Sequence, residues 1–213
     1  MSLRAYHGDP TIKATYLARV RAHREADQLI KGIYWQHGKG CAVGCTVHSD
    51  NHAAYETELG VPRVLARLED GLFERLPNGQ ALAWPAQFLE AIPVGADLSL
   101  VWPQFAVWLL VDPTDGVIQF AKTERVRQVI QNVADAYVQV TTWPVEKKQR
   151  RKWRALREVA YAADAAAAAY AAYAAAYAAY AAADAAISIY HIRQSEKLLA
   201  LLRVAPVAGE ART

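Results

Sequence analysis

The sequence predicts an all-α fold, a compact multi-helix domain with a long alanine- and tyrosine-rich C-terminal helix or helical hairpin. Apolar residues recur at the three- and four-residue spacing of a helix, as in Leu65, Leu68, Leu72 and Leu76. Residues 146–205 contain neither glycine nor proline, and residues 160–186 are mostly alanine, which has the highest helix propensity. No convincing run of alternating apolar and polar residues indicates a strand, although residues 117–120 are compatible with a short extended piece.

The composition limits the class of protein. A chain of 213 residues is long enough for one large domain, or for one domain and an appendage. A net charge of +3 does not make the whole molecule a polyanion binder, and two cysteines do not make a disulfide framework. The opening MSLRAYHGDP has no apolar run and the alanine tract is too weakly hydrophobic to span a bilayer, so we expect a cytoplasmic protein with no membrane partner.

Capping and breaking residues place the individual helices. Asp9-Pro10 begins the first helix, which Gly32 is expected to end. Ser49 or Asp50 caps a short helix, and Pro62 starts the next. Further helices are predicted over residues 85–91 and 103–111 and, after a turn at 112–116, as far as about residue 138. The expected organisation is a helical core over residues 1–140, a helical arm over 141–205 that packs on the core or on a second subunit, and a disordered tail over 206–213.

The stretch from Gly32 to Pro62 holds both cysteines, three of the six histidines and five of the eleven glycines. Gly38-Lys39-Gly40 is typical of turns that direct backbone N–H groups and a lysine toward an anion, although it does not match the Walker pattern. The leading interpretation is a non-enzymatic binding protein that takes a small anionic ligand, with nucleotides as a candidate class, at the Gly38–His52 loop. The residues predicted to bind it are Tyr34, Trp35, Gly38, Lys39, Gly40, Cys41, Cys45, His48 and Ser49, where a helix is expected to start.

A metal-dependent enzyme, with zinc as the candidate metal, is an alternative interpretation of the same stretch. Thiolates and imidazoles are the ligands that zinc prefers, and the candidate ligands lie close together in the sequence. On one straight helix the first and last would lie too far apart for one ion, so a single zinc site requires a bend. The candidate ligands are Cys41, Cys45, His48, His52 and Glu56.

A cysteine-based enzyme is a further alternative. Cys41 or Cys45 beside His48 has the residue types of a nucleophile and its base, and Asp50 or Glu56 would orient the imidazole. The sequence leaves open whether the protein is an enzyme.

Two stretches are similar to a family of uncharacterised bacterial and bacteriophage proteins. They are AYHGDPTIKATYLARVRAHREAD at residues 5–27 and KGIYWQHGKGCAVGCTVHSDNHAAYETELGVPRVLARLEDGLFERLPNG at residues 31–79. The resemblance spans about residues 4–112, and the alanine-rich segment with its closing helix over 187–204 resembles that family's variable C-terminal part. The resemblance implies a cytosolic protein in a phage or mobile-element context, and it implies nothing about a catalytic activity.

The C-terminal segment suggests an assembly or nucleic-acid-interaction protein as a third class. Basic residues are concentrated from Lys147 to Arg157, where they could contact phosphates. Tyrosines from Tyr170 to Tyr180 step at three and four residues and form one seam, which suits packing on the core or a homo-oligomer.

Overall fold

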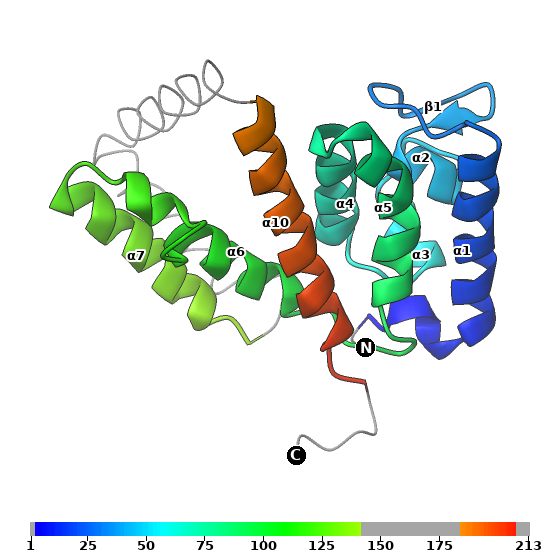
Figure 1. Ribbon diagram of the computed structural model, residues 1–213. Helices are drawn as coiled ribbons and strands as arrows, with labels where there is room; N and C mark the ends of the chain where they lie inside the picture. Colours follow the sequence, from blue (N-terminus) through cyan, green and yellow to red (C-terminus); the bar gives the residue numbers. More distant parts are fainter. Residues whose placement is uncertain (1–2, 142–183, 208–213) are drawn as a thin grey trace. The chain divides into compact units, whose positions relative to one another are not determined.

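The computed structural model describes residues 3–141 and 184–207 (Figure 1). These residues divide into two compact units, one formed by residues 3–101 with 194–207 and one by residues 102–141 with 184–193. The boundary between the units therefore falls inside the stretch predicted as a single core. The all-α prediction is confirmed, since the only strands among the described residues are the two-residue β1 (Trp35–Gln36) and β2 (Lys39–Gly40).

The first unit contains most of the helices. They are η1 (Ala5–Gly8), α1 (Pro10–Glu25), α2 (Ala42–Val47), α3 (Ala54–Glu58), α4 (Arg63–Arg75), α5 (Asn78–Ala91) and the C-terminal part of α10 (Asp184–Arg203). Helix α1 packs against α5 and α2, and α4 packs against α5. The core contains large side chains with at most 1 % of their surface exposed, among them Trp84, Tyr6, Tyr55, Phe73 and Phe88.

Helix α1 begins as predicted but ends earlier than Gly32. Asp9 caps it by accepting a hydrogen bond from the Thr11 backbone N–H. At the other end Asp27 adopts a left-handed conformation with φ of 52°, and the Gln28 N–H bonds the His23 carbonyl. The chain then turns back, so that Leu29 pairs with Gly40 in an isolated bridge.

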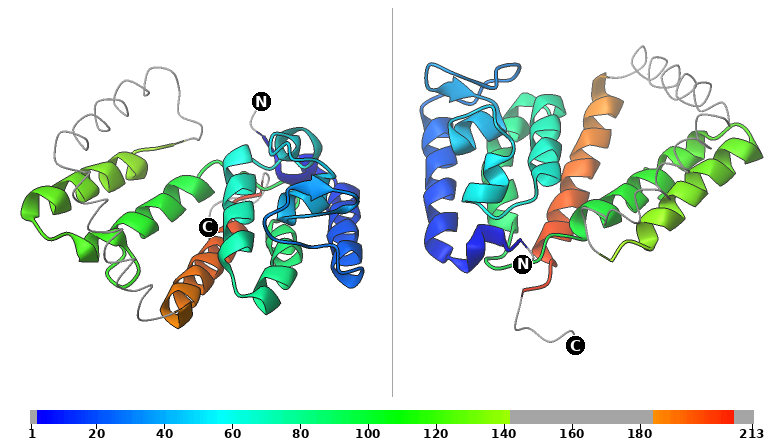
Figure 2. Two further views of the ribbon diagram at one scale, coloured as in Figure 1. Left: turned by 90° about the horizontal axis from the view of Figure 1, so that it is seen from above. Right: turned by 180° about the vertical axis from the view of Figure 1, so that it is seen from behind.

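Helix α2 was not predicted from the sequence. It is a short helix inside the glycine-rich stretch, and all of its residues are buried. A Cβ on Gly40 would lie 2.1 Å from the Tyr34 carbonyl oxygen, and a Cβ on Gly44 would lie 1.6 Å from the same atom. Only glycine lets the Tyr34 backbone approach α2 so closely. The β1–β2 hairpin consequently lies at the C-terminal end of α1 and next to α2 (Figures 1 and 2).

Several other boundaries differ from the sequence prediction. Helix α3 starts at Ala54, not near Ser49, and α5 starts at Asn78 and includes Pro85. Residues 206 and 207 were assigned to the disordered tail, but Pro206 accepts a bond from the Asp97 N–H and Val207 bridges Ala96. They belong to the first unit.

The second unit contains α6 (Val101–Val111) from residue 102 onward, η2 (Val117–Phe120), α7 (Glu124–Val138) and the N-terminal part of α10. Residues 117–120 form a 3₁₀ turn instead of an extended piece. Thr123 caps α7, Trp102 meets Tyr137 edge to face, and Arg193 pairs with Asp115 at 2.8 Å. None of the helices in the described parts of the chain combines the length and apolarity needed to cross a bilayer.

The contact between Tyr34 and Gly44 generates the first prediction. Gly44→Ala places a methyl group where the Tyr34 carbonyl lies, so the loop must move and the free energy of unfolding should fall by at least about 2 kcal/mol. Urea denaturation of both proteins measures the difference.

Gly71→Ala is the matched control on α4. A Cβ there meets only the Arg75 guanidinium at 3.0 Å, which is the end of a flexible side chain. Because alanine is the better helix former, this variant should be neutral or more stable by up to about 1 kcal/mol. Equal effects of the two substitutions would show that the Tyr34 contact does not restrict Gly44.

Candidate functional site

The backbone donors of the glycine-rich turn are used within the protein. The Gly40 N–H bonds the Gln28 carbonyl at 3.0 Å, and the Cys41 N–H bonds the Ile33 carbonyl at 2.7 Å. The Gly44 N–H points at the Cys41 sulfur at 3.5 Å. These three donors therefore stabilise the glycine-rich stretch, and among them the Gly40 N–H is already bonded and is not free for an anion.

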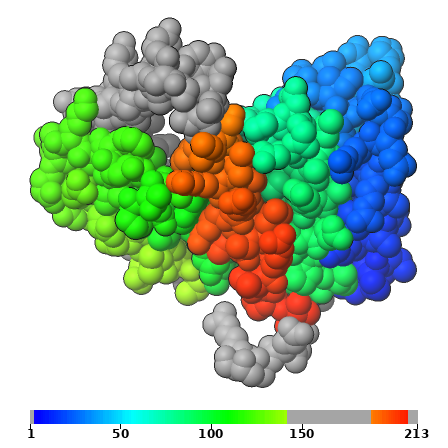
Figure 3. Space-filling model, in the orientation of Figure 1, coloured from blue at the N-terminus to red at the C-terminus, as the bar shows by residue number. Residues whose placement is uncertain are grey.

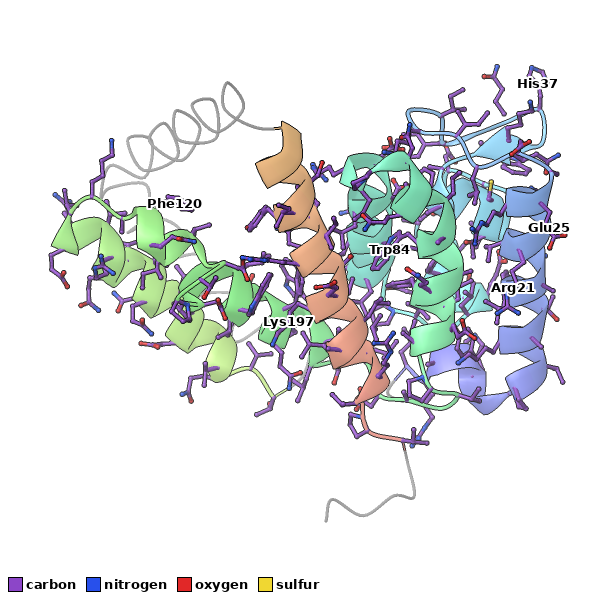
Figure 4. The ribbon with its side chains drawn as sticks, viewed as in Figure 1. Arg21, Glu25, His37, Trp84, Phe120 and Lys197 are labelled. Carbon is purple, nitrogen blue, oxygen red and sulfur yellow. The ribbon has the colours of Figure 1, made fainter. Side chains whose placement is uncertain are left out.

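The hairpin directs its predicted ligand-binding side chains to different faces. Trp35 is paired with Gly40, and Gln36 is paired with Lys39. Paired residues share a face and neighbours alternate, so Lys39 and Trp35 lie on opposite faces of the hairpin. Figure 4 shows His37 at the outer tip of this loop. Lys39 is thus separated from the aromatic ring with which it was expected to act.

Both cysteines are buried free thiols in and beside α2. Burial raises the pKa of Cys41, and the neighbouring Asp70 carboxylate raises it further. Burial also raises the pKa of Cys45 to about 12. A nucleophilic cysteine needs the opposite shift and an accessible sulfur, so this environment does not favour the cysteine-based enzyme.

The five predicted metal ligands do not converge. The cysteine thiols face carbonyl groups, His48 meets His23, His52 meets Asp70, and Glu56 accepts a bond from the Arg63 N–H. Within residues 3–141 and 184–207 no three His, Cys, Asp or Glu side chains form a group that could hold a metal ion. The bend that a zinc site requires is present, but it points the ligands in different directions.

Ser49 also has a different role from the one predicted. Its hydroxyl accepts a bond from the Asn51 N–H at 3.1 Å in a local turn. Helix α3 starts five residues later, so Ser49 does not present a helix N-terminus to a ligand.

A polar group is buried between α2, α3 and α4. The Tyr55 hydroxyl donates to Glu69 Oε2 at 2.6 Å, and His52 Nε2 lies 3.4 Å from Asp70 Oδ2. The ring of Tyr34, which is 57 % exposed, meets His52 edge to face. Glu69 Oε1 and Asp70 Oδ1 are buried, and no N–H or O–H group of the described residues bonds them. Burial, followed by the charge of Asp70, raises the pKa of Glu69 well above its ordinary value, which favours the protonated carboxyl.

A second cluster lies at the surface, where the end of α1 meets the end of α2. His23 Nε2 is 2.8 Å from His48 Nε2, and His23 Nδ1 is 2.6 Å from Gln28 Oε1. The Trp35 ring stacks on His48 with centroids 4.6 Å apart and planes inclined by 12°. Arg19 Nη1 donates to the Thr46 carbonyl at 2.8 Å. We call Arg19, His23, Trp35 and His48 the basic–aromatic cluster.

Charges around this cluster act on His48. Its pKa is lowered by partial burial first, and then by the positive charges of Arg19 and His23. Glu58 acts in the other direction, and its carboxylate also accepts a hydrogen bond from the Tyr16 hydroxyl. The Arg19 guanidinium lies over the Tyr16 ring at 4.7 Å. The cluster is therefore a partly exposed group of nitrogen donors in which a positive charge on His48 is disfavoured by burial and by its neighbours.

The sequence identified only part of this cluster. Trp35 and His48 were predicted site residues, whereas Arg19 and His23 were not. The spacing of His23 and Arg19, one helical turn apart, was the available signal. It could not be used, because their partners come from a separate helix. In the space-filling view the light-blue hairpin and the blue α1 lie side by side (Figure 3).

Two predicted interaction surfaces lie outside the described residues, namely the basic run from Lys147 to Arg157 and the tyrosine seam from Tyr170 to Tyr180.

Comparisons of the chain with protein-family models, with curated proteins and with solved structures found no match. The resemblance to bacterial and phage proteins remains a prediction.

The environments of the two thiols predict that both react slowly with alkylating reagents. Raising the pKa of Cys45 from 9.0 to about 12 lowers its thiolate fraction near neutral pH roughly a thousandfold. We expect iodoacetamide to label neither cysteine of the folded protein appreciably in the time that labels both in urea, as followed by mass spectrometry. Rapid labelling of one thiol in the folded protein at neutral pH would identify an activated nucleophile instead.

The raised pKa of Glu69 predicts that the stability of the protein depends on pH. Below about pH 4.5 its carboxyl is protonated in the folded and unfolded chains alike. As the pH rises through that value, the unfolded chain loses the proton and the folded chain keeps it. This group therefore lowers the free energy of unfolding as the pH rises toward the folded pKa. Glu69→Gln, which stays neutral, should remove that decline.

Urea denaturation of wild type and Glu69→Gln between about pH 4 and pH 8 measures this decline in the free energy of unfolding. The stability of wild type minus that of the variant should decrease with rising pH. Glu90→Gln, at an exposed position, is the control that should show no such trend. A difference that grows with pH would mean that Glu69 is ionised in the folded protein.

Proposed function

We propose that this protein is a non-enzymatic binding protein that takes a small anionic ligand, with nucleotides among the candidates, at the basic–aromatic cluster. The proposal keeps the ligand class that the sequence suggested and moves the site. His48 and Trp35 remain in it, Arg19 and His23 join it, and the Gly38-Lys39-Gly40 turn leaves it.

The observation that carries the proposal is the convergence of Arg19, His23 and His48 at the surface. His23 and His48 meet through their Nε2 atoms at 2.8 Å, and Arg19 and His23 both lower the pKa of His48. The charged form of the His48 imidazole is therefore disfavoured in the free protein. A bound anion would reverse this effect, because each positive group would then face a negative one.

The donor chemistry also suits an anion. A guanidinium carries five N–H donors in a fixed plane, and the bond to the Thr46 carbonyl uses one of them. That bond and the contact with the Tyr16 ring fix the orientation of Arg19 before a ligand arrives. Ordering the side chain in advance reduces the entropy lost on binding.

The ligand-binding prediction is tested by calorimetric titration of inorganic phosphate, pyrophosphate, AMP and ATP. Arg19→Gln keeps an N–H for Thr46 and removes the charge. Hydrogen bonds to charged groups contribute about 1.5–3 kcal/mol, so we expect the affinity to fall about ten- to hundredfold. The melting temperature of the variant checks that it remains folded.

Two control variants make the test specific. Arg21→Gln makes the same change on the same helix, at a residue that pairs with Glu90 at 3.5 Å, and should leave the affinity unchanged. Lys39→Gln tests the loop. Loss of binding in Lys39→Gln with retention in Arg19→Gln would return the site to the glycine-rich turn. If none of the four anions binds the wild type, the proposed function is wrong.

A further inference from the structure

The hydrogen-bond partners of His23 select one tautomer of its neutral imidazole. Its Nδ1 faces the side-chain oxygen of Gln28 at 2.6 Å, so this nitrogen carries the hydrogen. A neutral imidazole has one N–H, and its Nε2 is then a bare acceptor. The hydrogen in the 2.8 Å contact between the two Nε2 atoms accordingly belongs to His48.

This pairing occupies the nitrogens that an anion would need. His48 donates its N–H to His23, and the bare Nε2 of His23 would repel an anionic oxygen. For one oxyanion to accept hydrogen bonds from both rings, His23 must gain a proton at Nε2 and the contact between the rings must open. Gln28 can keep its bond to Nδ1 throughout, because both nitrogens of a charged imidazole are donors.

We infer that the contact between His23 and His48 is a proton-dependent latch on the anion site, and that the ligand is a compact oxyanion bound together with a proton. This inference rests on the proposed function and deepens it. In the closed state the two imidazoles satisfy each other. In the liganded state the oxyanion replaces that bond with two charge-assisted hydrogen bonds.

The charged and polar groups around the latch come from three elements and the hairpin. On α1 the Arg19 guanidinium attracts the anion. In the free protein it disfavours a positive charge on the imidazole of His48. Glu58 on α3 favours the charged imidazole, and its bond from Tyr16 holds it in place. His48 caps α2, and the Trp35 ring covers one face of it.

The stacking of Trp35 also defines the ligand class. With centroids 4.6 Å apart and nearly parallel planes, the side of Trp35 that faces the donors is already occupied by His48. A nucleobase could stack there only by displacing one of the donors. The cluster therefore recognises the oxyanion itself, and a nucleotide would bind through its phosphate.

Sulfate is the appropriate probe, because it stays doubly charged from about pH 5.5 to about pH 8. Any proton that is taken up on binding is therefore bound by the protein and not by the ligand. Calorimetric titration in two buffers of different ionisation enthalpy gives the number of protons bound. At any pH at which His23 is neutral in the free protein, we expect uptake of about one proton per sulfate and an affinity that falls about tenfold per pH unit. AMP should bind within about threefold of inorganic phosphate, and adenosine should not bind.

Two variants separate the latch from other sources of proton uptake. His23→Gln supplies an amide N–H without titrating, so it should bind sulfate with an affinity independent of pH and without proton uptake. His48→Asn shortens the side chain, so that its amide N–H no longer reaches the position of the imidazole Nε2, and it suits the left-handed backbone at this position, where φ is 53°. The affinity of this variant for sulfate should therefore fall. If His23→Gln is unstable, the ¹⁵N resonances of wild-type histidines serve instead. The Nε2 signal of His23 should move from an unprotonated to a protonated position as sulfate is added.

The outcomes distinguish the inference from the function on which it rests. Sulfate binding by the wild type without proton uptake, or unchanged uptake in His23→Gln, would overturn the latch and leave the anion site standing. Binding of AMP together with adenosine would overturn the assignment of a compact oxyanion. No binding of sulfate or phosphate at any pH would overturn both proposals.

Discussion

The close contact between the Tyr34 carbonyl and two glycines determines how the first unit is organised around its hairpin. Gly40 and Gly44 let a backbone segment approach α2 more closely than any Cβ would permit. The Cys41 N–H then bonds the Ile33 carbonyl across the same contact. Helix α2 is consequently buried along its whole length, and only its C-terminal end reaches the surface. One end carries the capping Cys41, and the other carries His48.

Burial gives chemically similar loop residues different properties. The thiols lie inside, where desolvation favours their neutral forms, and their neighbours are carbonyl oxygens and the Asp70 carboxylate. Glu69 experiences the same desolvation and is bonded to Tyr55. The imidazoles of His23 and His48 lie at the surface, where a charged form can be solvated or paired. Reactive residue types are therefore present in the core, where burial keeps them neutral, whereas the two imidazoles remain accessible to solvent.

The groups of the basic–aromatic cluster also stabilise the ends of two helices. Arg19 satisfies a carbonyl in the last turn of α2, where basic side chains interact favourably with the helix dipole. His48 ends that helix in a left-handed conformation, and His23 lies in the last turn of α1. The structural and proposed functional roles of these residues are compatible, because a guanidinium or a charged imidazole carries more donors than the fold uses.

The sequence by itself determined the all-α class, the cap at Asp9 and the start of α4 after Pro62. These features depend on local propensity, on capping and on the period of apolar residues, all of which can be read from neighbouring positions. The tertiary structure decided the roles of the glycines and the grouping of the site. Gly38, Gly40 and Gly44 have the same side chain, yet Gly38 has a left-handed φ of 78° whereas Gly40 and Gly44 lie against a backbone carbonyl. His23 and His48 are 25 positions apart and meet only because the chain reverses after Asp27. Contacts between such distant residues are fixed by packing, and no pattern within either helix encodes them.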